Sequence, residues 1–285
     1  MAQAILWVAK ATANHHNGEM PRTSTAGLFG AALILASAAH AEPVAPTISA
    51  ETYLRYAGYV AGLNVFSLHV KAALAPERYR METRYNPEGV LNVFISGELH
   101  TLAHGGWHAG RATPARYQTW GVWRGETRDT QIDYAAGSPL IRKLIPPIAG
   151  EREPVTPADQ AGTIDTLSAF AYLAQQVNTT GRCDGDARLF DGRRLSVVSA
   201  VHVGEEFLTR ESRSSFSGPA TRCDISGKQI AGFLLGDAPT DGTGKTSGSV
   251  WFARPAAAAV MLPVRMTFVV PVLGNATLYL TTNPK

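Results

Sequence analysis

The sequence predicts a mainly β protein: a large, curved antiparallel sheet (half-barrel, barrel or spiral) with one long helix packed on its concave side. Three observations support this prediction. Apolar and polar residues alternate with period two in many short segments, turn residues recur about every 8–12 residues, and only one segment after residue 41 has clear helical periodicity. A sheet of about ten or more strands does not stay flat, so we favour a closed or spiral sheet over a two-sheet sandwich.

The first half of the chain contains a series of alternating segments separated by turns. Asn86-Pro87-Glu88-Gly89 and His104-Gly105-Gly106 are expected turns, because Gly, Pro and Asn favour the required backbone angles. The expected strands are Tyr53–Val60, Val65–Ala73, Tyr79–Tyr85, Val90–Leu102, Ala115–Trp123 and Glu126–Tyr134. Ala136–Gly162 contains five prolines and is expected to be a long, mostly irregular connection, of a kind that often covers a site.

The helix is expected over Asp165–Val177, with Thr163 or Asp165 as its N-cap. Leu167, Phe170 and Ala174 recur at the spacing of one helical face, which predicts that this face is buried. Strands then resume. They are expected over Ala187–Phe190, Arg194–His202, Phe207–Ser214, Ala220–Ile230, Ser249–Phe252, Val260–Val270 and Ala276–Thr282.

An internal segment, Met20–Ala41, has the features of a bacterial secretory signal peptide. It has a positive residue, Arg22, then the short apolar run Ala26–Ala36, then the small-x-small cleavage motif Ala39-His40-Ala41. The apolar run is shorter than the roughly 20 residues that span a bilayer. We therefore expect cleavage after Ala41 and a periplasmic protein. Residues 1–19 would be a non-native or extended N-terminus, 42–50 a flexible leader and 51–285 a single β-rich domain.

Composition excludes several function classes. The 285 residues include 26 Lys and Arg and 23 Asp and Glu, with no run of like charges. Nucleic-acid binding needs a concentrated basic face, so we expect no nucleic-acid partner. After Ala41 no apolar segment approaches transmembrane length, so no transmembrane segment is expected in the mature chain.

The chain has two cysteines, Cys183 and Cys223. An even number in an exported protein predicts a disulfide bond. A redox pair or a metal site are the alternatives. A redox pair usually has the spacing C-x-x-C, and no further cysteine is present to complete a thiolate zinc site.

Four segments, in this order, resemble DUF3108, a family of uncharacterised exported bacterial proteins. They are YAGYVAGLNVFSLHV, IDTLSAFAYL, RLFDGRRLSVV and WFARPAAAAVMLPVRM, and the resemblance runs from about Tyr53 to Leu280. It implies a periplasmic protein built on a curved antiparallel sheet, similar in kind to lipoprotein-carrier half-barrels and to the DUF1849 envelope proteins, which form a β-spiral with a disulfide. It implies no catalytic residues.

Three histidines at four-residue spacing, His100, His104 and His108, are weak candidates for metal ligands. In a hairpin that turned at Gly105-Gly106 they could approach zinc-binding distance, but no carboxylate or thiolate ligand accompanies them, and we predict no metal and no cofactor. Asp165, Ser168 and the distant His202 are the three residue types of a catalytic Ser-His-Asp triad. Ser168 lacks the G-x-S-x-G context, and helix capping explains Asp165 better, so no catalytic residue is predicted.

Aromatic residues are the remaining candidates for a binding site. The concave face of a half-barrel must be filled by a helix, a loop or a ligand. The candidates for ligand contact are Tyr117, Trp120, Trp123 and Phe170. We therefore expect a non-enzymatic envelope protein that binds an apolar ligand, such as a lipid acyl chain, or a protein or peptide partner. The alternatives are a hydrolase of envelope glycan or lipid, and a structural component of an envelope complex.

Overall fold

The computed structural model describes residues 51–89, 92, 96–236, 244–255, 258–270 and 274–282. The predicted signal peptide, the residues before it and the leader 42–50 lie outside the described residues, and those assignments stay predictions.

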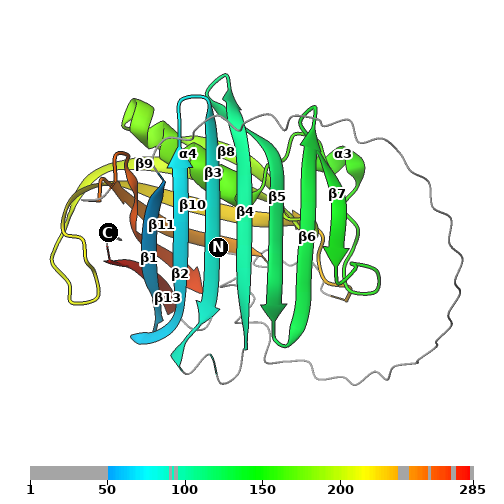
Figure 1. Cartoon of the computed structure of the whole chain (residues 1–285), viewed down its shortest axis with the longest axis horizontal. Helices are drawn as coiled ribbons and strands as arrows, with labels where there is room; N and C mark the ends of the chain where they lie inside the picture. The colour runs from blue at the N-terminus through cyan, green and yellow to red at the C-terminus, as the bar shows by residue number, and fades with distance from the viewer. Residues whose placement is uncertain are drawn as a thin grey trace, which may run out of the picture.

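The described residues form thirteen strands in one antiparallel sheet (Figure 1). The sheet order is β7-β6-β5-β4-β3-β2-β1-β13-β12-β11-β10-β9-β8. The bounds are β1 Thr52–Val60, β2 Leu63–Leu74, β3 Arg78–Pro87, β4 Gly97–His108, β5 Arg111–Trp123, β6 Glu126–Ala135, β7 Ser138–Ile145, β8 Gly185–Phe190, β9 Leu195–Leu208, β10 Gly218–Ala231, β11 Lys245–Ala253, β12 Leu262–Val270 and β13 Gly274–Thr282.

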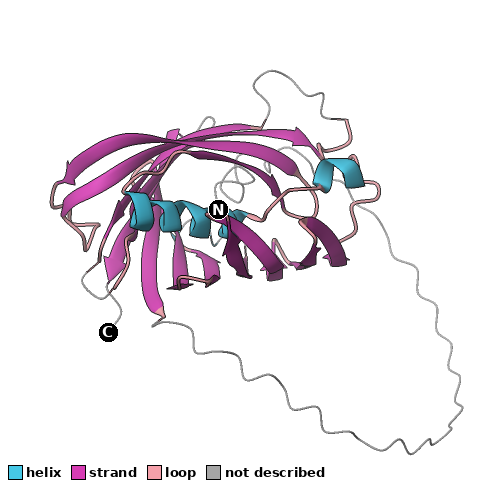
Figure 2. Cartoon of the chain, turned by 90° about the horizontal axis from the view of Figure 1, so that it is seen from above, coloured by secondary structure: helices cyan, strands magenta, loops and turns pink. Residues whose placement is uncertain are grey.

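The sheet folds over on itself but does not close into a barrel. Strands β1–β7 form a front arm, β8–β12 form a rear arm, and β13 joins the two by pairing with β1 and β12. Figure 2 shows the two arms as facing layers with a helix between them. Because β7 and β8 are the sheet edges and do not pair with each other, the prediction of a curved antiparallel sheet is confirmed in its open form.

The helix between the arms is α4, Thr166–Thr180, and a short helix α3, Pro157–Gln160, precedes it. Asp165 caps α4 by accepting a hydrogen bond from the backbone N–H of Ser168, and Gly181 ends it in the left-handed conformation. α4 contacts β3, β4, β5 and β8, so it lies on the concave side as predicted. Its 15 residues make the expectation of a long helix an overstatement.

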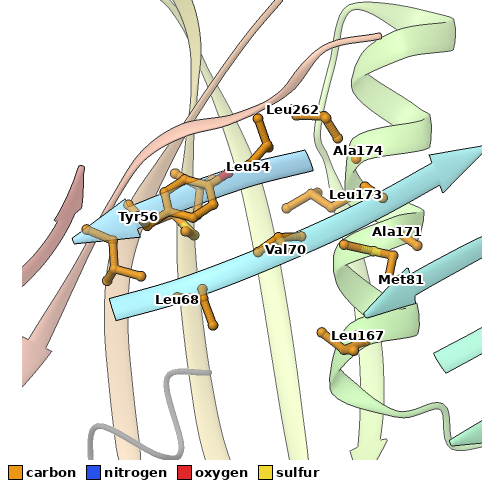
Figure 3. Close-up of a cluster of buried hydrophobic side chains, with 14 of the residues drawn as sticks. Leu54, Tyr56, Leu68, Val70, Met81, Leu167, Ala171, Leu173, Ala174 and Leu262 are labelled. Atoms are coloured by element: carbon orange, nitrogen blue, oxygen red, sulfur yellow. The ribbon is translucent and has the colours of Figure 1, made fainter. Parts of the chain in front are cut away.

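The core lies between α4 and the inner faces of the strands. Figure 3 shows Leu54 and Tyr56 from β1, Leu68 and Val70 from β2, and Met81 from β3 in a buried hydrophobic cluster. Leu167, Ala171, Leu173 and Ala174 of α4 belong to the same cluster. The period-two alternation of these strands places one face of each strand in this core, which is why the sequence pattern predicts them well.

Three local predictions are wrong. β4 continues through Gly105-Gly106, and its turn lies at Ala109 and Gly110, whose φ angles are 48° and 74°. A Cβ on Gly105 would lie 2.3 Å from the carbonyl oxygen of Thr113 and 2.8 Å from the Tyr79 hydroxyl. The glycine at this position therefore permits close strand packing, not a turn.

The other two errors concern strand boundaries. The proline-rich segment 136–162 contains a complete strand, β7, because only Pro139 falls within it and β7 is an edge strand, where proline is tolerated. Phe207 does not begin a new strand but belongs to β9, which runs without interruption to Leu208. Of the predicted strand Val90–Leu102, residues 90, 91 and 93–95 lie outside the described residues.

Candidate functional site

A pocket with a volume of about 1060 Å³ lies between the rear arm, α4 and the start of β5. Its lining comes from neighbouring positions on β8, β9, β10 and β11, together with Val269 of β12, Tyr172 of α4, Gly162, Ile164, Arg111 and Ala112. The pocket therefore crosses four adjacent strands and reaches toward the opposite arm.

The floor of the pocket is a row of small side chains. Ala187 pairs with Val198, Val198 with Gly227, and Gly227 with Thr246, so these four residues share one face of the sheet. A Cβ on Gly227 would lie 3.0 Å from Thr246 Cγ2 and 3.1 Å from Val198 Cγ1, which confirms that the row faces one way. The empty space exists because this row contains a glycine and an alanine where larger side chains would fill it.

Three charged residues of the lining, Arg188, Lys228 and Lys245, belong to a different row. Arg188 pairs with Val197, Val197 with Lys228, and Lys228 with Lys245. Since side chains alternate along a strand, this row leaves the sheet on its convex face, and all four residues are exposed. We infer that these four residues border the pocket with their main-chain atoms. The interior of the pocket is therefore mainly apolar.

The walls are held in place by contacts of α4, and of the segment before it, with β8. Ile164 bridges β8 in parallel, since its N–H donates to the Arg188 carbonyl and its own carbonyl accepts from the N–H of Phe190, both at 2.9 Å. Tyr172 stands over Gly185, where an added Cβ would lie 3.5 Å from the ring. The Tyr172 hydroxyl accepts a hydrogen bond of 2.7 Å from the Gln176 amide.

Two buried oxygens near the pocket have no hydrogen-bond partner among the described residues. They are Thr246 Oγ1, on the pocket floor, and Gln176 Oε1, beside Tyr172. A buried polar atom without a partner is costly. Both atoms have almost no accessible surface, so neither is exposed to a molecule in the pocket.

The four aromatic candidates do not lie together, and none of them lines the pocket. Tyr117 is buried in the core, where its hydroxyl accepts a hydrogen bond of 2.8 Å from Thr119. Trp123 is also buried and packs on Tyr85 at 5.6 Å between ring centroids.

The other two aromatic candidates occupy different surroundings. Trp120 is half-buried, alternates to the convex face of β5 and stacks on His100 with ring centroids 5.3 Å apart. Phe170 is half-buried against the core from α4.

Asp165 and Ser168 are adjacent, as their helix-start position predicts, but they form a buried polar chain. The Ser168 hydroxyl donates to Asp165 at 2.5 Å and accepts from the Tyr79 hydroxyl at 2.7 Å. Burial raises the pKa of Asp165 to about 6, partly offset by the hydrogen bonds from Ser168. His202 takes no part in these hydrogen bonds; its ring nitrogen lies 3.8 Å from the sulfur of Cys183.

The three histidines are spread along β4. His100 contacts Glu98 at 2.5 Å, and hydrogen bonds from Asn86 and Arg84 help to hold the pKa of Glu98 at about 2. Desolvation lowers the pKa of His104, helped by Arg80 and Arg116. Because eight residues of strand separate His100 from His108, about 26 Å, the three cannot share a metal ion. No cluster of three potential ligands occurs in the described part of the chain.

Cys183 and Cys223 form the predicted disulfide, which links the segment after α4 to β10. Both cysteines are fully buried. The redox-pair and metal alternatives are therefore not needed to explain these residues.

Sequence reasoning missed the pocket floor. Ala187, Val198, Gly227 and Thr246 come from four strands, and nothing in their sequence spacing marks them as neighbours. Gly227, inside an otherwise regular strand, is the one available indication, since such a glycine often marks a close approach or a site.

Comparison with known proteins identifies the family. The family model described as "Protein of unknown function (DUF3108)" matches residues 53–281. A comparison with curated proteins gives no match. Among solved structures, a beta-barrel-like protein of domain of unknown function DUF1849 from Brucella abortus is similar, with 12% sequence identity and a TM-score of 0.48 over 81% of this chain and 95% of that chain. The chain belongs to the DUF3108 family.

Proposed function

We propose that this protein is a periplasmic, non-enzymatic binding protein that supports the cell envelope by holding an apolar ligand in the pocket between its two arms. The pocket itself carries the proposal. Its volume of about 1060 Å³ is slightly above the range for small-molecule sites, about 300–1,000 Å³. A sheet that folds over a helix without closing leaves this space accessible.

The residues around the pocket favour a ligand with a long apolar part. Ala187, Val198, Ile164 and Ala112 offer apolar contact, as a lipid acyl chain requires. The acyl chain of a lipid would match this lining.

Two observations support a location outside the cytoplasm. The sequence contains a predicted signal peptide, Met20–Ala41, and the structure contains a disulfide bond, which is common in oxidising compartments. Among the described helices, none combines the length and the apolar character needed to cross a bilayer.

The test combines native mass spectrometry of protein purified from the periplasm with titration of a fluorescently labelled fatty acid into delipidated protein. Val198→Trp should fill the pocket and weaken binding of the probe by about tenfold or more. The matched control is Val201→Trp, three residues along β9 at an exposed position outside the pocket lining, which should bind within about twofold of the unchanged protein.

The results separate the proposal from its alternatives. A protein that carries no lipid and does not bind the probe would refute the proposal, as would equal loss in both tryptophan variants. Loss of binding in Trp120→Ala with full retention in Val198→Trp would place the ligand on the convex face instead.

A further inference from the structure

A second feature of the rear arm is an uncovered length of strand. β9 has 14 residues, but the edge strand β8 pairs only with Leu195–Ala200. Beyond this point β10 covers one side of β9, and no described strand covers the other. Asp184 accepts a hydrogen bond of 2.9 Å from the N–H of His202. No backbone hydrogen bond to the outer edge of 203–208 occurs among the described residues.

Apolar side chains accompany this free edge. Val201, Val203 and Phe207 are 56%, 53% and 69% exposed, among the most exposed large apolar residues of the described chain. Gly204 lies between them, and an added Cβ there would meet no atom within 4 Å. Both the main chain and the apolar side chains of this segment are thus accessible.

The other edge of the sheet is protected. β7 contains Pro139 and the charged residues Arg142 and Lys143, which form ion pairs with Asp133 and Asp129 of β6. Proline and charged side chains are the usual means by which edge strands avoid pairing with other chains. The free edge of β9 has no proline. Glu206 on this strand is exposed and already has partners within the protein, since it accepts hydrogen bonds from Trp251 at 3.0 Å and from Arg222 at 3.4 Å.

We propose that the outer edge of β9, residues 203–208, docks an extended segment of a partner protein, which adds to the sheet as a strand. The segment carries a basic residue opposite Glu205 and apolar residues beside Val203 and Phe207. Strand addition supplies main-chain hydrogen bonds, and the side chains supply specificity. Glu205 is exposed and forms no ion pair with the described residues, so a basic residue complements it.

A second copy of the same chain fits this edge poorly. In a symmetric antiparallel dimer centred on the free segment, Glu205 of one copy faces Glu206 of the other, and like charges directly opposite each other destabilise a strand pair. Residues 203–208 lie outside the pocket lining, so docking at this edge and ligand binding in the pocket are tested independently.

The probe is a labelled peptide of alternating threonine and valine with a central lysine, and its partner probe has a central glutamate. Fluorescence anisotropy measures binding of both to the purified protein, and amide hydrogen exchange locates it. We expect about tenfold tighter binding of the lysine peptide, with new protection at 203–207. Glu205→Lys should reverse this preference. Ile141→Lys on β7 is the control and should change neither affinity.

Three results would overturn the proposal: no binding of either peptide, protection on β7 in place of β9, or no response of the preference to Glu205→Lys. Concentration-dependent dimerisation in sedimentation, with protection of the same amides and no peptide present, would instead assign the edge to a second copy. The Glu205→Lys variant changes one exposed side chain, and its thermal midpoint serves as the check that it is folded.

Discussion

The inner faces of the two arms differ in side-chain size near the pocket. On the front arm, the face toward α4 is lined with aromatic residues: Tyr79, Tyr85, Tyr117, Trp123 and Tyr134. On the rear arm, the corresponding face near the pocket carries Gly185, Ala187, Ala200, Gly227 and Gly248. Both walls use the same strand geometry, so the pocket results from side-chain volume on one wall and not from a gap in the sheet.

The aromatic wall is also connected by specific contacts. Tyr79 packs on Trp107 with ring centroids 4.8 Å apart, and Tyr85 packs on both Phe66 and Trp123. Such pairs contribute beyond their buried area. The rear wall has no comparable aromatic contact among its described inner residues near the pocket. We expect stability to depend on the front wall and binding to depend on the rear wall.

Truncation should have the largest effect on the front wall. Tyr79 is 1% exposed and donates to Ser168, so Tyr79→Ala should lower the free energy of unfolding by about 3–5 kcal/mol. Val198→Ala on the pocket floor should lower it by about 1 kcal/mol or less, because this side chain already borders empty space. Urea denaturation measures both. Similar losses at the two positions would contradict the division between the walls.

The disulfide should matter mainly to the rear arm. It closes a loop between residues 40 apart in sequence, so replacing both cysteines with serine should cost about 3–4 kcal/mol. Hydrogen exchange should accelerate more in β8–β10 than in β1–β5, because the bond ties β10 to the end of α4. An unchanged thermal midpoint after reduction of the bond would show that it does not stabilise the fold.

The pH dependence of stability tests the polar chain behind the front wall. Burial raises the pKa of Asp165 from 3.8 to about 6, so the folded protein keeps this proton over a range in which the unfolded chain has lost it. The stabilising contribution is complete below about pH 4, falls as the pH rises, and is lost above about pH 6.

The matched variant is Asp165→Asn, which cannot titrate. The difference in unfolding free energy between the two proteins should change by about 2–3 kcal/mol between pH 4 and pH 7, with the unchanged protein losing more. Urea denaturation at several pH values measures it. Parallel pH profiles would show that Asp165 titrates at its ordinary pKa.

The smallest expected effect concerns a single glycine of the rear wall. At Gly185 an added Cβ would lie 3.5 Å from Tyr172, an ordinary contact distance, so Gly185→Ala should stabilise the protein by about 0.4–1 kcal/mol. Thermal unfolding measures the change. Destabilisation would indicate that the small side chain at Gly185 is needed for packing against α4.

Local patterns in the sequence predict most of the fold. Alternation marks the strands of the front arm, the spacing of Leu167, Phe170 and Ala174 marks α4, and Asp165 caps the helix as expected. The disulfide follows from an even number of cysteines in a chain with a predicted signal peptide. Each of these predictions depends on residues close together in sequence or on a simple count.

The site could not be predicted in the same way. Its floor depends on the register of four strands, and register is set by tertiary pairing that single segments do not encode. The residues predicted to contact a ligand were all large aromatic residues. Two of them, Tyr117 and Trp123, are buried in the core. Small residues make the pocket, and a small residue gives no periodic signal.

The pairing of β1 with β13 affects both the folding rate of the chain and its tolerance of circular permutation. Arg55 lies opposite Thr282, and Val60 opposite Ala276, so the first and last described strands lie side by side in the middle of the sheet. Because β13 pairs with both β1 and β12, the front and rear arms cannot join before β13 has formed. Folding that depends on such long-range contacts is expected to be slow. A short linker could therefore join the end of β13 to the start of β1. With new termini between Ala109 and Gly110, the resulting circular permutant should keep the sheet intact.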